Sequence, residues 1–165
     1  CRFEEILIER EIGILAVFDN QRFRVELQSH EVGIVINHKS LQKHSAYILQ
    51  NIELPGFDRE QQHLLTTLVN WHIGHLKPNE FLRSSRYHEQ DIITLIRILR
   101  LAVIFNKSRQ ATENLKAFTF QTQGSDNNWL LRLKEGYLER NPLIWNELRI
   151  ESNLLKDLEM GLIFN

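Results

Sequence analysis

The alternation of apolar and polar positions predicts helices in the middle of the chain. Between residues 29 and 51 it indicates two short helices. The turn Leu54-Pro55-Gly56 then ends this pattern, because proline cannot continue a helix and glycine permits the turn. Asp58 follows as a predicted N-cap with Gln61 three positions later, which is the pattern of a capping box. We therefore expect a further helix from Asp58 to His72.

The strongest element runs from Asp91 to Phe105. Its apolar residues lie almost all round the helix and leave only a narrow polar face with Arg97 and Arg100. Such a helix belongs in a core. Its two arginines are expected to reach outward past the apolar surface or to meet a buried acid.

After Thr112 the pattern changes to that of strands. Residues 117–123 and 129–133 alternate between apolar and polar positions around the run GSDNN, which predicts a β-hairpin. Asn141-Pro142 predicts a helix start in which the asparagine side chain accepts from free backbone N–H groups. That helix is expected to run through Leu143, Leu148, Leu154 and Leu158. GLIF at 161–164 could add a third strand.

These elements predict an α+β protein with two parts. A mainly helical domain is expected at 29–112, and a small α+β domain with a β-hairpin, a helix and a short strand at 113–165. Residues 1–28 form a separate N-terminal segment, in which an apolar stretch precedes charges at alternate positions. A chain of 165 residues can bury one sizeable core, or a core with a small added layer.

Composition excludes several classes of protein. The net charge of −1 argues against a broad electrostatic grip on nucleic acid. A lone cysteine cannot form an internal disulfide, which fits a reducing cytosol. The apolar stretch 6–18 is broken by Glu9, Arg10 and Glu11, so it is neither a signal peptide nor a membrane span. We expect a cytoplasmic protein, with peripheral attachment at the inner membrane as a further option. The start at Cys1 indicates a fragment or a processed piece.

Histidines supply the candidate chemistry. All seven lie between His30 and His88. The pair His30-Glu31, His44 and His72 could form a metal site only if folding brings them together, with neutral imidazoles and an ionised carboxylate as ligands. The alternative is that these histidines are surface or partly buried helix residues. The sequence leaves both possibilities open.

Longer strings resemble a known family. SHEVGIVINHKSLQKHSAYILQN, LPGFDREQQHLLTTLVNWH and LIRILRLAVIFNKSRQAT are together similar to the C-terminal part of bacterial exopolyphosphatases and guanosine pentaphosphate phosphohydrolases. The resemblance runs without gaps from about 30 to 112 and more loosely to the end, but does not extend to 1–28. HSAYILQN and LPGF look closer to the exopolyphosphatase branch. The resemblance implies an HD-like helical domain followed by a small α+β domain.

In those relatives a histidine, a His-Asp pair and a later aspartate hold divalent metal. Here the pair is His30-Glu31, Val103 stands where the later acid would fall, and no histidine precedes His30. The resemblance therefore implies a degenerate metal site made at most of His30, Glu31, His44 and His72. We expect no metal in this chain.

The same resemblance places catalysis in an N-terminal actin-like module with glycine-rich phosphate loops and Mg²⁺. The seven glycines of this chain are scattered singly and form no phosphate loop. We therefore expect no catalytic residue here and assign catalysis and Mg²⁺ to a missing N-terminal module. This fragment alone is expected to be inactive.

A remaining role is to bind a polyanion. Candidate side chains for contacts with polyphosphate are Lys39, Lys43, His44, His72 and Arg109. The leading hypothesis is the C-terminal fragment of an exopolyphosphatase-like hydrolase that releases orthophosphate from inorganic polyphosphate. This part would bind the polymer, its own N-terminal module and a second copy in a homodimer. Alternatives are a guanosine pentaphosphate phosphohydrolase fragment, an HD-type metal phosphohydrolase and a non-enzymatic dimerisation module. The alternative for these cationic side chains is that they belong to a solvated face, where nearby acidic side chains balance their charge.

Overall fold

The computed structural model describes residues 41–81, 83–106, 118–123 and 127–164. The N-terminal segment 1–28, the first of the two short helices and the predicted domain boundary at 112 lie outside these ranges. The chain divides into two compact units, one that ends at Arg100 and one that begins at Leu101. Each unit is described by itself.

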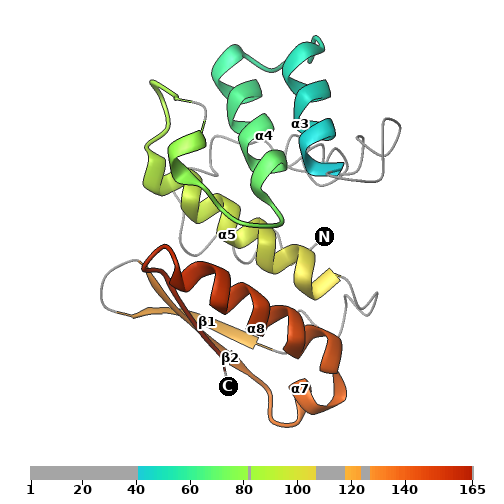
Figure 1. Ribbon diagram of the computed structural model, residues 1–165, viewed down its shortest axis with the longest axis vertical. Helices are drawn as coiled ribbons and strands as arrows, with labels where there is room; N and C mark the ends of the chain where they lie inside the picture. The colour runs from blue at the N-terminus through green and yellow to red at the C-terminus, as the bar shows by residue number, and fades with distance from the viewer. Residues whose placement is uncertain (1–40, 82, 107–117, 124–126, 165) are drawn as a thin grey trace. The chain divides into compact units, whose positions relative to one another are not determined.

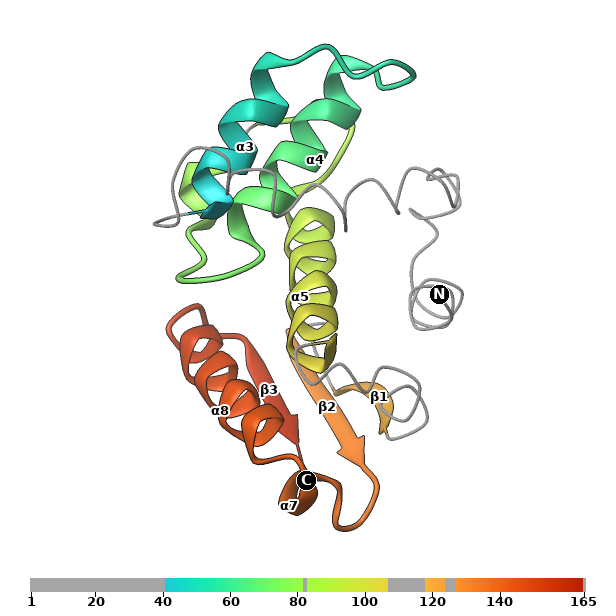
Figure 2. The same cartoon turned by 90° about the vertical axis from the view of Figure 1, so that its right-hand side faces the viewer.

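The first unit contains a pair of neighbouring helices, α3 (Leu41–Asn51) and α4 (Arg59–Trp71), which lie side by side in Figures 1 and 2. Leu49 of α3 packs with Leu65 and Val69 of α4, and these three side chains are almost fully buried. Gln62 of α4 also donates to the carbonyl oxygens of Leu49 and Ile52 at 2.7 and 2.8 Å. It thereby satisfies acceptors that the end of α3 leaves without a helical partner.

The predicted capping box at the start of α4 is confirmed. The Asp58 carboxylate accepts from the backbone N–H of Gln61 at 2.9 Å, and the Gln61 side chain accepts from the backbone N–H of Asp58 at 3.0 Å. The prediction succeeded because both bonds join residues three positions apart and depend on local sequence alone.

The predicted core helix is α5 (Glu89–Asn106), which follows the short 3₁₀ helix η3 (Pro78–Glu80). Of the two arrangements expected for its arginines, the outward one is wrong, because Arg97 and Arg100 are only 2% and 4% exposed. A buried acid as their partner stays a prediction. Arg100 donates from Nη1 to the carbonyl oxygen of Trp71 at 2.9 Å. That oxygen belongs to the last residue of α4, where helix carbonyls lack helical donors.

The second unit contains a three-stranded sheet in the order β1-β2-β3. Strands β1 (Phe118–Gln123) and β2 (Asn128–Leu133) form the predicted antiparallel hairpin, with Phe120 opposite Leu131. Strand β3 (Gly161–Phe164) is the predicted third strand, and it pairs in parallel with β2. A parallel partner needs a crossover connection, which α7 (Tyr137–Arg140) and α8 (Pro142–Lys156) provide. The short helix α7 was not predicted.

Two details of α8 differ from the expectation. Asn141 makes no side-chain cap bond to α8, and its amide donates to the carbonyl oxygen of Tyr137 at 2.9 Å instead. The Asn141 side chain thus closes α7, since it satisfies a carbonyl four positions earlier in the chain. The buried positions of α8 are Ile144, Leu148, Glu151 and Leu155. Of the leucines through which this helix was expected to run, Leu148 is buried and Leu143 is 51% exposed. The helix ends at Lys156, before Leu158.

Helices and a small mixed sheet together confirm the α+β class. The HD-like character of the helical part stays a prediction. Within the described ranges, no helix combines the length and the apolar character needed to cross a bilayer.

Candidate functional site

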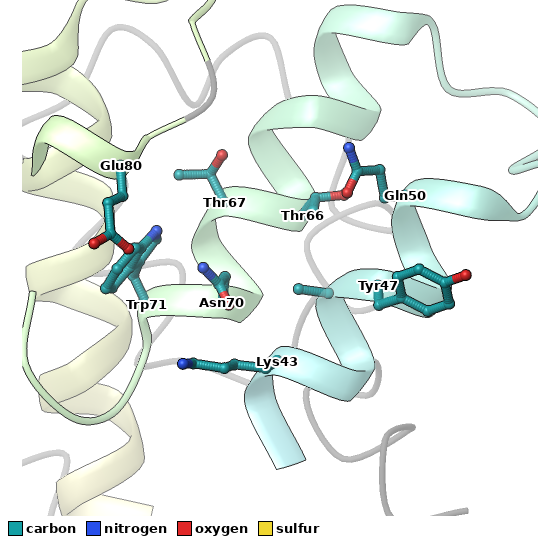
Figure 3. A pocket seen from close by; sticks show the side chains of 9 residues that line it. Lys43, Tyr47, Gln50, Thr66, Thr67, Asn70, Trp71 and Glu80 are labelled. Carbon is teal, nitrogen blue, oxygen red and sulfur yellow. The ribbon is translucent and has the colours of Figure 1, made fainter. Parts of the chain in front are cut away.

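A pocket of about 190 Å³ lies between α3, α4 and η3 in the first unit (Figure 3). Lys43, Ala46, Tyr47 and Gln50 line it from α3, Thr66, Thr67, Asn70 and Trp71 from α4, and Glu80 from η3. The four α3 residues stand at helical positions i, i+3, i+4 and i+7, which lie on one face. The α4 residues stand at positions i, i+1, i+4 and i+5, so two adjacent i, i+4 pairs form a row along one side of that helix. The two rows face the same cavity because α3 packs along α4.

Several polar groups on this pocket have no partner among the residues that the structure describes. The hydroxyl oxygen of Thr66 is buried and forms no hydrogen bond with any described residue. Over the same ranges, no hydrogen bond or ion pair involves the side chains of Lys43, Gln50 or Asn70. Thr67 differs, since its hydroxyl donates to the carbonyl oxygen of His63 at 2.9 Å. Buried polar groups are normally satisfied, so the Thr66 hydroxyl calls for a partner from outside these residues.

One wall of the pocket is aromatic and one edge is charged. Trp71 is buried and packs against Phe81 with ring centroids 5.9 Å apart. Glu80 forms an ion pair with Lys77 at 2.7 Å, with side chains that are 56% and 59% exposed. Exposed pairs of this kind contribute at most about 1 kcal/mol. The Glu80 carboxylate is therefore weakly held and can turn to another donor.

The structure places the predicted site residues in different surroundings. Among the described candidates, Lys43 lines the pocket, whereas His44 and His72 do not. His72 is buried just after α4, and its Nδ1 lies 2.6 Å from the carbonyl oxygen of Val69. Lys39, Arg109, His30 and Glu31 lie outside the described residues. Over the described ranges, no three metal-ligating side chains of histidine, cysteine, aspartate or glutamate come together.

Acids near the start of α4 are engaged with the segment that precedes α5. Arg86 donates to the Asp58 carboxylate at 2.7 Å, and this bond lowers the pKa of Asp58. Ser84 donates to the Glu60 carboxylate, which lowers the pKa of Glu60. The Ser84 hydroxyl also accepts from the backbone N–H groups of Arg86 and Tyr87. These carboxylates hold the segment in place.

Sequence reasoning missed Tyr47, Gln50, Thr66 and Asn70. A signal was present, because polar or aromatic residues recur at helical spacing within LQKHSAYILQN and within TTLVNW. Such a row is typical of any solvated helix face. It becomes a site only through the pairing of α3 with α4, which the spacing alone does not reveal.

The sequence that forms this helical pair and this small sheet has clear relatives. Residues 15–152 match the family described as Ppx/GppA phosphatase, domain III. The chain belongs to this family, and the predicted relationship is confirmed at that level. The match begins inside the segment 1–28, so the expectation that this segment has no counterpart in the family is wrong from residue 15 onward.

Three curated relatives share one name, guanosine-5'-triphosphate,3'-diphosphate pyrophosphatase. The protein from Vibrio atlanticus (strain LGP32) is 37% identical over 131 residues, which cover 78% of this chain and 25% of the relative. The protein from Pseudoalteromonas translucida (strain TAC 125) is 33% identical over 140 residues, or 84% of this chain and 27% of the relative. A Vibrio cholerae protein is 32% identical over 138 residues, or 82% and 26%. The chain thus spans about a quarter of the length of these relatives.

Proposed function

We propose that this chain is the C-terminal part of a phosphoanhydride hydrolase and helps to hold the substrate. The observation that carries the proposal is that relatives 32–37% identical over most of this chain are named as pyrophosphatases of guanosine 5'-triphosphate 3'-diphosphate. We therefore take guanosine 5'-triphosphate 3'-diphosphate as the first substrate. This reverses the order that the sequence strings favoured. Inorganic polyphosphate is the second candidate, supported by the strings HSAYILQN and LPGF.

The proposed reaction is hydrolysis of a phosphoanhydride. The oxygen of a water molecule bonds to phosphorus, the bridging P–O bond breaks, and the water's proton passes to a base while the leaving phosphate departs. We assign this chemistry, and the Mg²⁺ that stabilises its negative charge, to an N-terminal module outside this sequence. The seven single glycines of the chain support this assignment, since a phosphate-binding loop needs several close together.

Lys43 is the residue proposed to hold phosphate. Its amine is exposed at the edge of the α3–α4 pocket and is unengaged by the residues described around it. A lysine amine can form charge-assisted hydrogen bonds to phosphate oxygens. Lys77 and Arg86 are weaker candidates, because each already forms an ion pair with an acid. With a net charge of −1, attraction for a polyanion must be local.

A homodimer and contact with the N-terminal module belong to the same proposal. Leu143, Trp145 and Ile150 of α8 are 51%, 42% and 46% exposed, which supports a partner at that helix. Arg149 covers part of this surface with its guanidinium carbon 5.0 Å from the Trp145 ring centroid. A cytoplasmic location is proposed with it.

Binding by the isolated chain tests the proposal. We expect calorimetry to show binding of guanosine 5'-triphosphate 3'-diphosphate, weakened about three- to tenfold by Lys43→Ala because one exposed charge-assisted contact is lost. Lys134→Ala is the matched control, since Lys134 is an exposed lysine of the second unit. Equal effects of both substitutions, or binding of neither this nucleotide nor polyphosphate, would contradict the proposal.

Phosphate release tests the assignment of catalysis. The isolated chain is expected to release no phosphate from either ligand above the rate without protein. Release that disappears in a His30→Ala, His72→Ala double variant would overturn it and would place the chemistry in this chain.

A further inference from the structure

The α3–α4 pocket has a size and a lining that suit one ring system better than a chain of phosphates. Its volume of about 190 Å³ is below the roughly 300–1,000 Å³ of sites for drug-sized ligands. Its charged lining residues are one cation, Lys43, and one anion, Glu80. A pocket with balanced charge gives a polyanion little attraction. The remaining wall offers amides, hydroxyls and aromatic rings, which suit a flat neutral group with polar edges.

We propose that this pocket binds the guanine base of the substrate, an inference that rests on the proposed function. The amides of Gln50 and Asn70 can each donate and accept, and neither is engaged within the ranges described. Such amides can form paired hydrogen bonds with a base edge, most familiarly that of adenine, so they favour a base without selecting guanine. The buried Thr66 hydroxyl supplies a further polar group that lacks a partner from the described chain.

Glu80 and the aromatic side chains account for the choice of base. Guanine presents two adjacent donors, N1–H and the N2 amino group, and a carboxylate can accept from both. Glu80 is available for this because its pair with Lys77 is exposed and weak. Trp71 offers a ring surface for the base on the α4 side of the pocket, whereas the Tyr47 ring extends away from Trp71 on the α3 side (Figure 3). Lys43 then stands at the edge, where the phosphates of a bound nucleotide can reach it.

The experiment compares ligands and variants of the 165-residue chain by calorimetry. The ligands are guanosine 5'-triphosphate 3'-diphosphate, its adenosine counterpart and linear polyphosphate. We expect the guanosine nucleotide to bind more tightly than the adenosine one. Gln50→Ala and Asn70→Ala should each weaken the guanosine nucleotide about three- to tenfold, as the loss of one or two hydrogen bonds predicts, and leave polyphosphate unchanged. Asn146→Ala, an exposed amide of α8, is the matched control.

Three outcomes separate this inference from the function on which it rests. Equal affinity for the two nucleotides, or no effect of Gln50→Ala and Asn70→Ala while Lys43→Ala still weakens binding, overturns the guanine pocket alone. Absence of binding for all three ligands overturns both. A shift of the Trp71 indole N–H resonance with guanosine alone supports the pocket without any substitution, and an unmoved Trp71 signal at saturation counts against it.

Discussion

At the scale of single residues, Asp58 has two roles that can be separated experimentally. Its carboxylate caps α4 and also pairs with Arg86 at 2.7 Å, and that bond lowers the pKa of Asp58. A group whose pKa is lower in the folded state stabilises the fold above its unfolded pKa of about 3.9. This contribution is lost as the pH falls through the folded pKa.

Asp58→Asn keeps a good N-cap and removes the titrating group. We expect wild type to be more stable than this variant at pH 6, by less than about 1 kcal/mol because the ion pair is half exposed. The difference should begin to shrink as the pH approaches about 3.9 and should vanish only below the lowered pKa of folded Asp58. Urea unfolding at several pH values measures it. A difference that is constant with pH would show that the ion pair contributes nothing to stability.

A second residue-scale prediction concerns Arg100. Its guanidinium is buried and donates to the carbonyl oxygen of Trp71. Arg100→Met removes both this hydrogen-bond donor and the buried positive charge. We expect a loss of about 1.5–3 kcal/mol in the free energy of unfolding, the usual range for hydrogen bonds to charged groups. Arg132→Met on the exposed side of β2 is the control. Similar losses for the two variants would contradict this role.

At the scale of elements, features that depend on neighbouring residues could be predicted from the sequence. Features that depend on residues far apart in the sequence could not. The capping box of α4 and the β1–β2 hairpin depend on neighbouring residues, and both were predicted. The parallel pairing of β3 with β2 and the burial of Arg97 depend on elements far apart in sequence. The pocket belongs to the second kind. Lys43 was found from its charge, whereas Gln50 and Asn70 face the cavity only because α3 lies against α4.

Helix α8 allows a matched test of this point. Leu143 and Leu148 were predicted alike from the sequence, yet Leu143 is 51% exposed and Leu148 is fully buried. Leu148→Ala should lower the free energy of unfolding by about 2–5 kcal/mol, because it leaves a cavity. Leu143→Ala should change it by no more than about 0.5 kcal/mol. Chemical denaturation measures both. Equal effects would mean that the other face of α8 is the buried one.

At the scale of the whole molecule, the important feature is where the two units divide. The division between Arg100 and Leu101 falls inside α5, which continues without a break from Glu89 to Asn106. Helix formation is cooperative, since each turn continues the hydrogen bonds of the turn before it. Loss of either unit therefore removes part of a helix that the other unit also uses. We infer that the two units unfold together.

Leu131→Ala tests this coupling. Leu131 is fully buried at the centre of the sheet in the second unit, and its truncation should destabilise that unit by about 2–5 kcal/mol. If the units unfold together, the urea midpoint observed at the Trp71 resonance in the first unit should fall as far as the midpoint observed at Trp129 in the second. Ile163→Ala, a half-exposed residue of the same sheet, should move neither midpoint. A fall at Trp129 with Trp71 unchanged would show that α5 breaks at the division and that each unit is stable by itself.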